Sequence, residues 1–417
     1  MAARGLSARL LVDLLARTRH LDEAVMRARQ SRARALRASR FLEQISHLSD
    51  AARRKWERSV AEYAAIRAEL DRSVALDDER SSAVRQAARS TRTARLSRMQ
   101  DVLDEALVVM KRSGEIGPPN RLPDGVVGMM VHPGRHAWWV FVFDDHRTEA
   151  KTVPGALIAF GTPTEQSRAL LAPFWPCLQS SRELRVFLHA LPRPIDVHAL
   201  VVEARPLLAS VPVTYPVDLP SEESSVDASG VGGRALVVSD PRGDLQGAQR
   251  EGHRVSALLA RNGVQVVHLF GAAADAERVR SELVHADLLH YGGHARLDSD
   301  LLQNGLLLAG SDRLTVGDVL LLPRVPRIVV LSGCETGRTE PASARDVDLG
   351  IAQAFLVRGA RQVLATTRPV ADTLAEAVSI AVHQRGAITP KTVQEALMAI
   401  QTAQPHVDWA AYRLLVR

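Results

Sequence analysis

The sequence predicts an α/β fold: a mostly parallel sheet flanked by helices, preceded by a smaller α/β part and an all-α N-terminal region. From residue 234 onwards, short apolar runs rich in β-branched residues alternate with helical stretches. Such alternation is typical of a parallel sheet that is covered on both faces. The first 115 residues contain no proline and only two glycines, and their apolar residues recur with helical spacing. The expected domains are therefore 1–115, 116–228 and 229–417.

Residues 1–115 are expected to form a helical bundle. Breaks near 46–50 and 75–78, where Asp50 and Asp77 can cap the helices that follow, predict three or four long antiparallel helices. Their apolar stripes are interpreted as core. The stripes are Leu10, Leu11, Leu14, Leu15 and Leu21; Trp56, Val60, Tyr63, Leu70 and Val74; and Leu96, Met99, Leu103 and Leu107.

Residues 116–228 have a different pattern. Prolines at 118, 119 and 123 indicate a linker, and the Ser-, Glu- and Gly-rich stretch Leu219–Gly233 indicates an exposed loop. A helix is predicted between Glu165 and Leu178. Strands are predicted at Val126–Val131, Trp138–Phe143, Ala156–Ala159 and Arg185–His189.

Residues 229–417 hold the alternating pattern. The predicted strands are Ala235–Ser239, Val264–Leu269, Asp287–Tyr291, Arg327–Leu331 and Gln362–Thr366. The predicted helices are Gln246–Asn262, Ala274–His285, Leu349–Arg358, Thr373–Arg385 and Pro390–Gln404. Functional residues on such a sheet are expected at the carboxyl ends of the strands.

Composition excludes several classes of protein. Apolar residues make up 46% and charged residues 24% of the 417 residues, which argues against a mostly disordered chain. No apolar run approaches the roughly 20 residues that span a bilayer, and no secretory leader pattern is apparent. Two cysteines cannot form a disulfide framework, so we expect a cytoplasmic protein.

The net charge of +6 is concentrated at the N-terminus. Residues 1–115 hold 24 basic and 16 acidic residues, and the remainder is slightly acidic. A basic helical region is one way to bind nucleic acid. Because 49 of the 53 basic residues of the whole chain are arginine and the N-terminal arginines are not interleaved with an aromatic platform, a solvated basic face is the favoured interpretation.

Two strand ends carry chemistry. Strand 287–291 runs into Gly-Gly-His294, and strand 327–331 runs into Ser-Gly-Cys334. Because parallel strands end at one edge of the sheet, a thiol and an imidazole are expected to face each other there. A thiolate is a nucleophile, and a nearby imidazole activates it and protonates the leaving amine. The spacing thus predicts a Cys-His dyad.

Other candidates have simpler interpretations. Cys177, within Phe-Trp-Pro-Cys-Leu, is expected to be an inert core residue. His290, inside an apolar strand, is expected to play a structural role that supports the site. Cys334, His294 and His290 make at most three metal ligands without compact zinc-site spacing, so no metal site is expected.

The two motifs together resemble those of CHAT domains, which are caspase- and separase-related cysteine peptidases of clan CD. The residues that carry the resemblance are His290-Tyr-Gly-Gly-His294-Ala295 and, about 40 residues later, Leu331-Ser-Gly-Cys334-Glu-Thr-Gly337. Further similar segments are Ala235–Pro241 with Glu251, Phe355–Ala360, Trp409-Ala410 and, in the preceding part, Val186–Pro192. The resemblance covers about residues 120–417.

The resemblance implies a caspase-like protease half over 229–417 and a non-catalytic supporting half over 116–228. It implies Cys334 as nucleophile and His294 as base and acid, without a cofactor. It places the oxyanion hole at the backbone N–H groups of Ala295 and Cys334. Gly293, Gly333 and Gly337 are expected to support the site, the latter two by allowing a sharp turn and the approach of a peptide. The chain departs from the family pattern at Ala295, where relatives carry glycine, and at Arg368, where they often carry tryptophan.

The resemblance also implies a regulated endopeptidase that cleaves partner proteins, as relatives do in bacterial immunity and cell death. A catalytically silent interaction scaffold and a nucleic-acid sensor on the basic helices are the alternatives. An acidic specificity pocket would favour a basic residue before the cleaved bond. Its candidate residues, which are equally interpretable as solvated loop charges, are Asp298, Glu335, Asp346 and Asp348.

The helices of 1–115 have two interpretations. They are expected to bind a protein activator or to recruit the substrate, in which case residues 116–417 fold on their own. Alternatively, they cover apolar surface, and their removal leads to aggregation.

Overall fold

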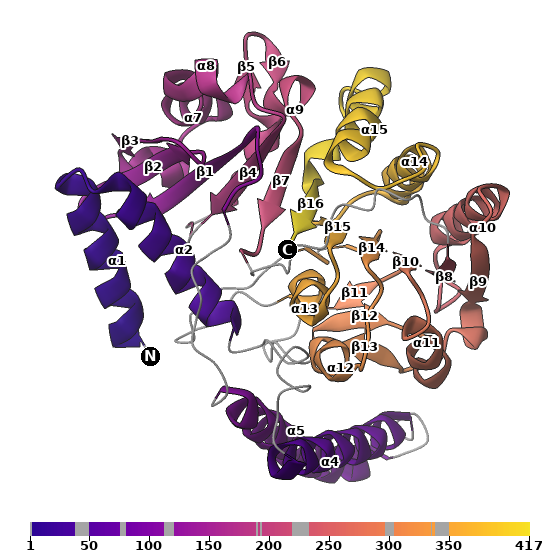
Figure 1. The fold of residues 1–417 in the computed structure, drawn as a ribbon. Coiled ribbons are helices and arrows are strands. Elements are labelled where there is room, and N and C mark those ends of the chain that lie inside the picture. Colours follow the sequence, from indigo (N-terminus) through magenta and orange to yellow (C-terminus); the bar gives the residue numbers. More distant parts are fainter. Residues whose placement is uncertain are drawn as a thin grey trace.

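The computed structural model describes residues 2–37, 50–75, 81–111, 121–188, 191, 194–218, 233–296, 304–334, 336–337 and 350–417. Figure 1 shows one large sheet with helices on both faces and helical hairpins beside it. The predicted linker at residues 118–119 and nearly all of the predicted loop 219–233 lie outside the described residues.

Eleven strands form one sheet that runs through both parts of the chain that follow the N-terminal helices. Their spatial order is β3 (Thr148–Val153), β2 (Trp138–Phe143), β1 (Val126–Pro133), β4 (Glu183–Leu188), β7 (Val213–Pro216), β16 (Tyr412–Val416), β15 (Gln362–Thr366), β14 (Ile328–Leu331), β10 (Leu288–Gly292), β8 (Arg234–Ser239) and β9 (Gln265–Phe270). We call β1 to β4 with β7 the N-terminal half of the sheet, and β8 to β10 with β14 to β16 the C-terminal half.

The strand directions confirm the predicted fold class. Strands β8, β9, β10, β14 and β15 are parallel to one another, and β1, β4, β7 and β16 form a second parallel set. The two sets meet where β16 runs antiparallel to β15. The protein is therefore α/β with a mostly parallel sheet flanked by helices. Because β16 is the last strand, the end of the chain joins the two halves of the sheet.

Helices cover both faces of the sheet (Figure 1). One face carries α7 (Pro163–Leu170), α9 (Leu207–Ser210), α10 (Gln246–Arg261), α14 (Asp372–His383) and α15 (Pro390–Ala403). The other face of the C-terminal half carries α11 (Ala276–Leu283), α12 (Val316–Leu321) and α13 (Ile351–Arg358). Local signals set these helix ends, because Thr389 and Thr315 begin α15 and α12 with capping boxes and Gly359 ends α13 with a φ of 118°.

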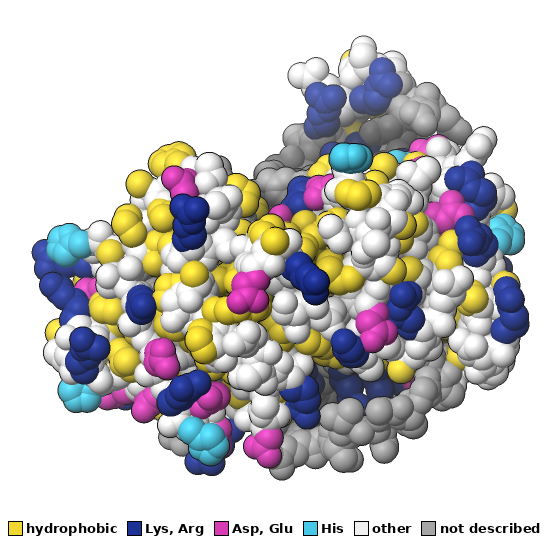
Figure 2. Space-filling model, turned by 90° about the horizontal axis from the view of Figure 1, so that it is seen from above, with side chains coloured by type: hydrophobic (Ala, Val, Ile, Leu, Met, Phe, Trp, Pro, Cys, Tyr) yellow, Lys and Arg dark blue, Asp and Glu magenta, His cyan; other side chains and the backbone are white. Residues whose placement is uncertain are grey.

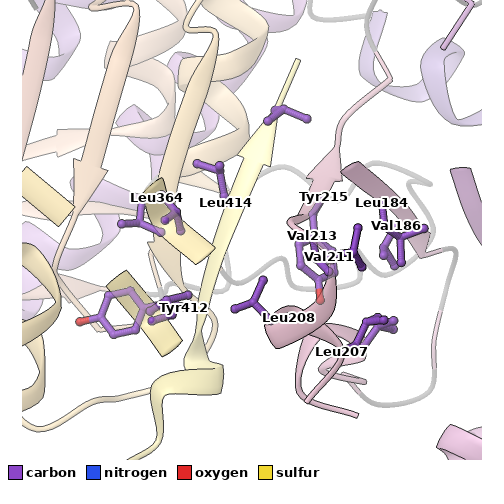
Figure 3. Close-up of a cluster of buried hydrophobic side chains, with 14 of the residues drawn as sticks. Leu184, Val186, Leu207, Leu208, Val211, Val213, Tyr215, Leu364, Tyr412 and Leu414 are labelled. Atoms are coloured by element: carbon purple, nitrogen blue, oxygen red, sulfur yellow. The ribbon is translucent and has the colours of Figure 1, made fainter. Parts of the chain in front are cut away.

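One apolar core crosses the junction between the halves. Figure 3 shows it around β7 and β16, where side chains of the two strands lie on the same face of the sheet. Burial of these side chains stabilises the two halves as one unit. The labelled residues are Leu184, Val186, Leu207, Leu208, Val211, Val213, Tyr215, Leu364, Tyr412 and Leu414.

The N-terminal helices form two hairpins that lie apart (Figure 1). The helices α1 (Ala2–Arg17) and α2 (Leu21–Arg37) pair with each other, and α4 (Asp50–Ala75) pairs with α5 (Ser82–Lys111). The chain turns between α1 and α2 at Arg19, whose φ is 65°. The described part of 1–115 therefore consists of two separate units, each packed on a different region of the molecule.

The α1–α2 hairpin covers apolar surface of the N-terminal half. Val12, Ala24 and Ala28 are among the helix residues that are fully buried against Met130, Phe141 and neighbouring side chains of the sheet. The Arg29 guanidinium binds the carboxylate of Asp218, which follows β7, at 2.6 and 2.9 Å. These contacts favour the covering interpretation for this hairpin.

The expected leucine core of the first helix is wrong. Leu10, Leu11 and Leu14 are 42–57% exposed, and Leu15 and Leu21 are only partly buried. The smaller residues Val12 and Ala16 face the sheet instead, because they allow α1 to approach it closely. In the stripe that begins at Trp56, the residues Trp56, Tyr63 and Leu70 are buried as expected. In the stripe that begins at Leu96, Met99 is buried as expected.

The α4–α5 hairpin rests on α12. The Tyr63 hydroxyl packs so closely on Gly317 that a Cβ atom there would lie 2.1 Å from its oxygen. Buried Arg67 lies 3.9 Å from the Asp318 carboxylate. Helix α12 follows a small sheet of β11 (Ala295–Arg296), β12 (Gly305–Leu307) and β13 (Arg313–Thr315).

Two local predictions are wrong in the N-terminal half. Residues 156–159 were expected as a strand but lie in helix α6 (Gly155–Phe160), which begins after Pro154 and contains the good helix formers Ala156, Leu157 and Ala159. The helix expected over 165–178 is broken into α7, a 3₁₀ turn (Ala172–Phe174) and α8 (Trp175–Leu178). Pro173 interrupts it because proline lacks the N–H that a continuous helix needs.

The face of the molecule in Figure 2 is mixed in charge. Basic and acidic side chains are interspersed over the face in Figure 2, without one large basic patch. Within the described ranges, no helix combines the length and apolarity that crossing a bilayer requires. In the same ranges, no group of three or more His, Cys, Asp or Glu side chains is placed to hold a metal ion.

Candidate active site

The loops that follow β10 and β14 lie side by side. The two strands are parallel neighbours, with Tyr291 opposite Leu331. Beyond this pair the backbone N–H of Ser332 donates to the Tyr291 carbonyl at 2.8 Å. A Cβ atom on Gly333 would lie 2.6 Å from the carbonyl oxygen of Gly293. The segments that carry His294 and Cys334 therefore emerge together at the carboxyl edge of the sheet.

The glycines allow this close approach within a bent segment. Gly333 lies in a bend and Gly337 in a turn, in agreement with the expected sharp turn, although neither they nor Gly293 have a left-handed φ. A side chain at Gly333 would collide with the neighbouring loop. At Gly337 a Cβ atom would lie 3.1 Å from the Cβ atom of Ala365 on β15. Glycine is needed because two backbones pack against each other.

The backbone of His294 is firmly held. Its carbonyl oxygen accepts hydrogen bonds from the Tyr291 hydroxyl at 2.6 Å and from the N–H of Leu307 at 2.9 Å. Tyr291 is fully buried, and burial raises the pKa of its hydroxyl, so that it remains a donor. These bonds fix the loop and leave the imidazole at the surface, where its side chain is 40% exposed.

Asp244 contacts the imidazole. Its Oδ1 lies 3.2 Å from Nε2 of His294. Asp244 belongs to the loop between β8 and α10, which is fixed because Oδ1 of Asp240 accepts the N–H groups of Asp244 and Leu245. Because a carboxylate oxygen accepts hydrogen bonds, this contact fits the tautomer that carries its proton on Nε2 and leaves Nδ1 as the acceptor. The sequence analysis missed Asp244, although β8 neighbours β10 and ends at the same edge.

Cys334 lies on a braced turn. Thr336 donates from Oγ1 to the carbonyl oxygen of Gly333 at 3.1 Å, and Thr366 of β15 donates to the same oxygen at 2.8 Å. The N–H of Gly337 donates to the carbonyl of Thr366 at 2.7 Å. Cys334 itself is a partly exposed free thiol. The neighbouring strand therefore holds the turn while the cysteine remains accessible.

Backbone N–H groups are available near the His294 imidazole and the Cys334 thiol. Leu307 donates to the carbonyl of His294, so the next opposite pair, Ala295 and Leu306, occupies a position without mutual hydrogen bonds. The N–H of Ala295 therefore points away from β12. Among the described residues, no backbone hydrogen bond uses the N–H of Cys334. Both donors are compatible with the oxyanion hole that the sequence analysis expected.

One known protein family matches more than half of the chain. Residues 165–415 match the CHAT domain. The chain belongs to the CHAT domain family. No curated protein sequence matches it.

The chain is also similar to two crystal structures of the Saccharomyces cerevisiae separase–securin complex, at 3.0 and 2.6 Å resolution. In each case the identity is 12%, the TM-score is 0.42, and the match covers 57% of this chain and 16% of the solved chain. This chain therefore corresponds to a small part of the solved protein.

A buried polar chain lies beneath the loops of the CHAT domain. His290 is completely buried, as expected, and its Nε2 is 3.0 Å from Oε1 of Glu251 on α10. Its Nδ1 is 3.3 Å from Nε2 of His383 on α14. Burial, reinforced by His290, holds the pKa of His383 well below its ordinary value, so His383 is neutral. These contacts link α10 and α14 to β10.

Arg368 of the CHAT domain is engaged in ion pairs. It follows β15, and its guanidinium binds Asp196 at 2.7 Å and Asp408 at 2.5 Å. Arg413 binds Asp196 as well, at 2.9 Å. Hydrogen bonding to Asp408 raises the pKa of Arg368 further, so it stays charged. Arg368 therefore ties β15 to the N-terminal half.

The expected acidic pocket stays a prediction. All four of its candidate residues lie outside the described residues: Asp298, Glu335, Asp346 and Asp348. Cys177 is a free thiol on α8 in the N-terminal half that is only partly buried and packs against the core, so it is not the core residue that was expected; its inertness stays a prediction.

Proposed function

We propose that the protein is a cysteine endopeptidase in which Cys334 is the nucleophile and His294 the general base and acid. The observation that carries the proposal is the adjacency of their two loops, with Gly333 packed on the carbonyl of Gly293. Both side chains are partly exposed, which allows a polypeptide to reach them. Membership of the CHAT domain family supports the same chemistry.

The reaction begins when Nδ1 of His294 takes the proton of the Cys334 thiol. The thiolate attacks the peptide carbonyl carbon, and the N–H groups of Ala295 and Cys334 stabilise the resulting oxyanion. The C–N bond then breaks, and His294 gives its proton to the leaving amine. Water then attacks the thioester carbonyl carbon while His294 accepts one of its protons. The C–S bond breaks, the carboxylic acid product leaves, and His294 returns the proton to the sulfur of Cys334.

Asp244 is proposed to orient the imidazole. Its contact with Nε2 favours the tautomer in which Nδ1 is free to accept the thiol proton. It also stabilises the imidazolium that forms during the reaction. Because both side chains are substantially exposed, this contact adds little to the stability of the fold.

The N-terminal helices are proposed to bind a regulatory protein, and the α4–α5 hairpin is the better placed of the two. It packs on α12, which directly follows β13. Strands β13, β12 and β11 are hydrogen-bonded in that order, and β11 begins immediately after His294. A partner that shifts this hairpin would therefore act on the loop that carries the base. Regulated cleavage in the cytoplasm, in immunity or cell death, is the corresponding proposed setting.

Mapping new protein N-termini in cells tests the proposed function. Wild type, Cys334→Ala and Cys177→Ala are each expressed, and the new N-termini are compared. The proposal predicts that specific cleavage products appear with wild type and Cys177→Ala and vanish with Cys334→Ala. Identical products in all three samples would instead favour a catalytically silent scaffold.

A further inference from the structure

The carbonyl oxygen of Gly333 is held by two buried hydroxyl groups. It accepts hydrogen bonds from Oγ1 of Thr366 at 2.8 Å and from Oγ1 of Thr336 at 3.1 Å. Both threonines are at most 1% exposed. A carbonyl oxygen has two lone pairs, so these two donors satisfy it completely. The peptide group that joins Gly333 to Cys334 is therefore fixed in one orientation.

The carbonyl oxygen of His294 is held in the same way. It accepts hydrogen bonds from the N–H of Leu307 at 2.9 Å and from the hydroxyl of Tyr291 at 2.6 Å. Tyr291 is 1% exposed and shares its proton with the carbonyl oxygen of Leu307 at 2.7 Å. The peptide group that joins His294 to Ala295 is therefore fixed as well.

These fixed carbonyls decide where two backbone N–H groups point. A trans peptide group is planar, and its N–H is directed opposite to its C=O. Every described peptide bond is trans. The oxygen of Gly333 is directed at buried hydroxyls, so the N–H of Cys334 is directed away from them. The same geometry turns the N–H of Ala295 away from Tyr291. These N–H groups are the two donors expected for the oxyanion hole.

The two peptide groups belong to neighbouring loops. A Cβ atom on Gly333 would lie 2.6 Å from the carbonyl oxygen of Gly293, the residue before His294. Donors stabilise an oxyanion only when they are already oriented at hydrogen-bond distance from it. A rotation of either peptide group would remove one donor. The hydroxyls that prevent this rotation therefore matter for the reaction and not only for the fold.

We propose that Thr366 is a positioning residue, which aims the backbone N–H of Cys334 at the oxyanion of the reaction. Tyr291 does the same for the N–H of Ala295. The inference rests on the proposed function and adds residues that act through the backbone. Thr366 gives the sharper test, because among the described residues its hydroxyl donates only to Gly333. Tyr291 shares its proton between two carbonyl oxygens.

The test compares two reactions of Cys334 in the full-length Cys177→Ala protein. In acyl transfer from p-nitrophenyl acetate, the sulfur attacks the carbonyl carbon, an oxyanion forms, and p-nitrophenolate leaves. Alkylation by iodoacetamide displaces iodide and forms no oxyanion. Thr366→Val keeps the shape of the side chain and removes its hydroxyl. We expect acyl transfer to slow about 10- to 100-fold, because the Cys334 N–H is no longer held in place. The rate and pH profile of alkylation should stay unchanged.

Two further variants separate positioning from a structural role. Thr366→Ser restores the hydroxyl and should restore acyl transfer. Thr214→Val is the matched control, since Thr214 is equally buried but lies on β7 and donates to Glu183 at 2.6 Å. We expect it to leave both reactions unchanged. Acyl transfer at the wild-type rate in folded Thr366→Val overturns the inference, and so does an equal slowing of both reactions.

If Thr366→Val does not fold, Tyr291→Phe gives the same test through the N–H of Ala295. Acyl transfer should again slow relative to alkylation, and an unaltered ratio of the two rates contradicts the inference. The parent Cys177→Ala protein is also compared with the same protein carrying Cys334→Ala. Equal acyl transfer in these two would reject the proposed function itself, whereas a fast parent with unaffected Thr366 and Tyr291 variants rejects the inference alone.

Discussion

Both halves of the sheet hold buried histidines, but they differ at the carboxyl edge, where the C-terminal half places a histidine in contact with a carboxylate. In the N-terminal half, His132 and His198 are buried, and desolvation lowers the pKa of each to about 4. In the C-terminal half His290 and His383 are buried as well, but His294 is 40% exposed and contacts an exposed carboxylate. Both halves have apolar cores on the same face. The comparison teaches that exposure at the carboxyl edge, and not the presence of histidine, marks the candidate site.

The largest expected effect is on activity. Cys334→Ala and His294→Ala should each lower cleavage by about a thousandfold or more, because the two groups act as a unit, and the double variant should be hardly worse. Both side chains are partly exposed, so the free energy of unfolding measured with denaturant should stay within about 1 kcal/mol of the wild-type value. Cleavage near the wild-type rate in either variant would show that the exposed histidine and cysteine at the carboxyl edge do not form the active site.

Substitutions in the N-terminal half should lower the free energy of unfolding and not the rate of cleavage. Arg29→Ala leaves the buried carboxylate of Asp218 without its cation, and we expect a loss of about 3–5 kcal/mol in the free energy of unfolding. Arg324→Ala removes a largely exposed partner of Asp287 and is the control, expected to cost less than about 1 kcal/mol. Equal losses in the two variants would show that the α1–α2 hairpin is not held by its buried ion pair.

Acid should destabilise the protein through the buried histidines. His198 has a pKa of about 4 when folded and about 6.5 when unfolded, so between these values the unfolded state binds more protons. Its contribution to stability is complete above pH 6.5 and is lost as the pH falls to about 4. His198→Gln should abolish up to about 3 kcal/mol of that pH-dependent loss in denaturant titrations. The same pH dependence in wild type and His198→Gln would contradict this assignment.

The smallest effect is expected for the orienting carboxylate. Asp244→Asn keeps the shape of the side chain but weakens its preference for an Nε2–H tautomer, and we expect cleavage to slow about 10- to 100-fold. Asp275→Asn is a control on a surface helix cap. Stability should change little in Asp244→Asn. A rate equal to wild type would remove Asp244 from the mechanism and leave the dyad intact.

Sequence patterns predicted the C-terminal half well because its signals are local. Continuous apolar runs located β8, β9, β10, β14 and β15, and the edge rule placed the loops of His294 and Cys334 together. The residues behind them could not be found in this way. Glu251 approaches His290 only through the packing of α10 on β10, and Thr366 approaches Gly333 only through the pairing of β15 with β14; no local pattern encodes either contact.

The N-terminal region was less predictable for a different reason. Leucine spacing indicated a helix correctly but not its buried face, because α1 presents Val12 and Ala16 to the sheet and leaves Leu10 and Leu14 outside. Periodicity within 1–115 also gave no information on which surface each hairpin covers. That choice depends on residues far along the chain, such as Asp218 for α2 and Gly317 for α4.

The most direct test of the central claim is whether His294 activates Cys334. The rate of iodoacetamide labelling of Cys334 is measured against pH in Cys177→Ala, with and without His294→Ala. The account predicts that Cys334 reacts at least tenfold more slowly at pH 7 without the imidazole, and that its half-maximal pH moves to about 8.5, the value of an ordinary cysteine. Identical labelling profiles with and without His294 would contradict it.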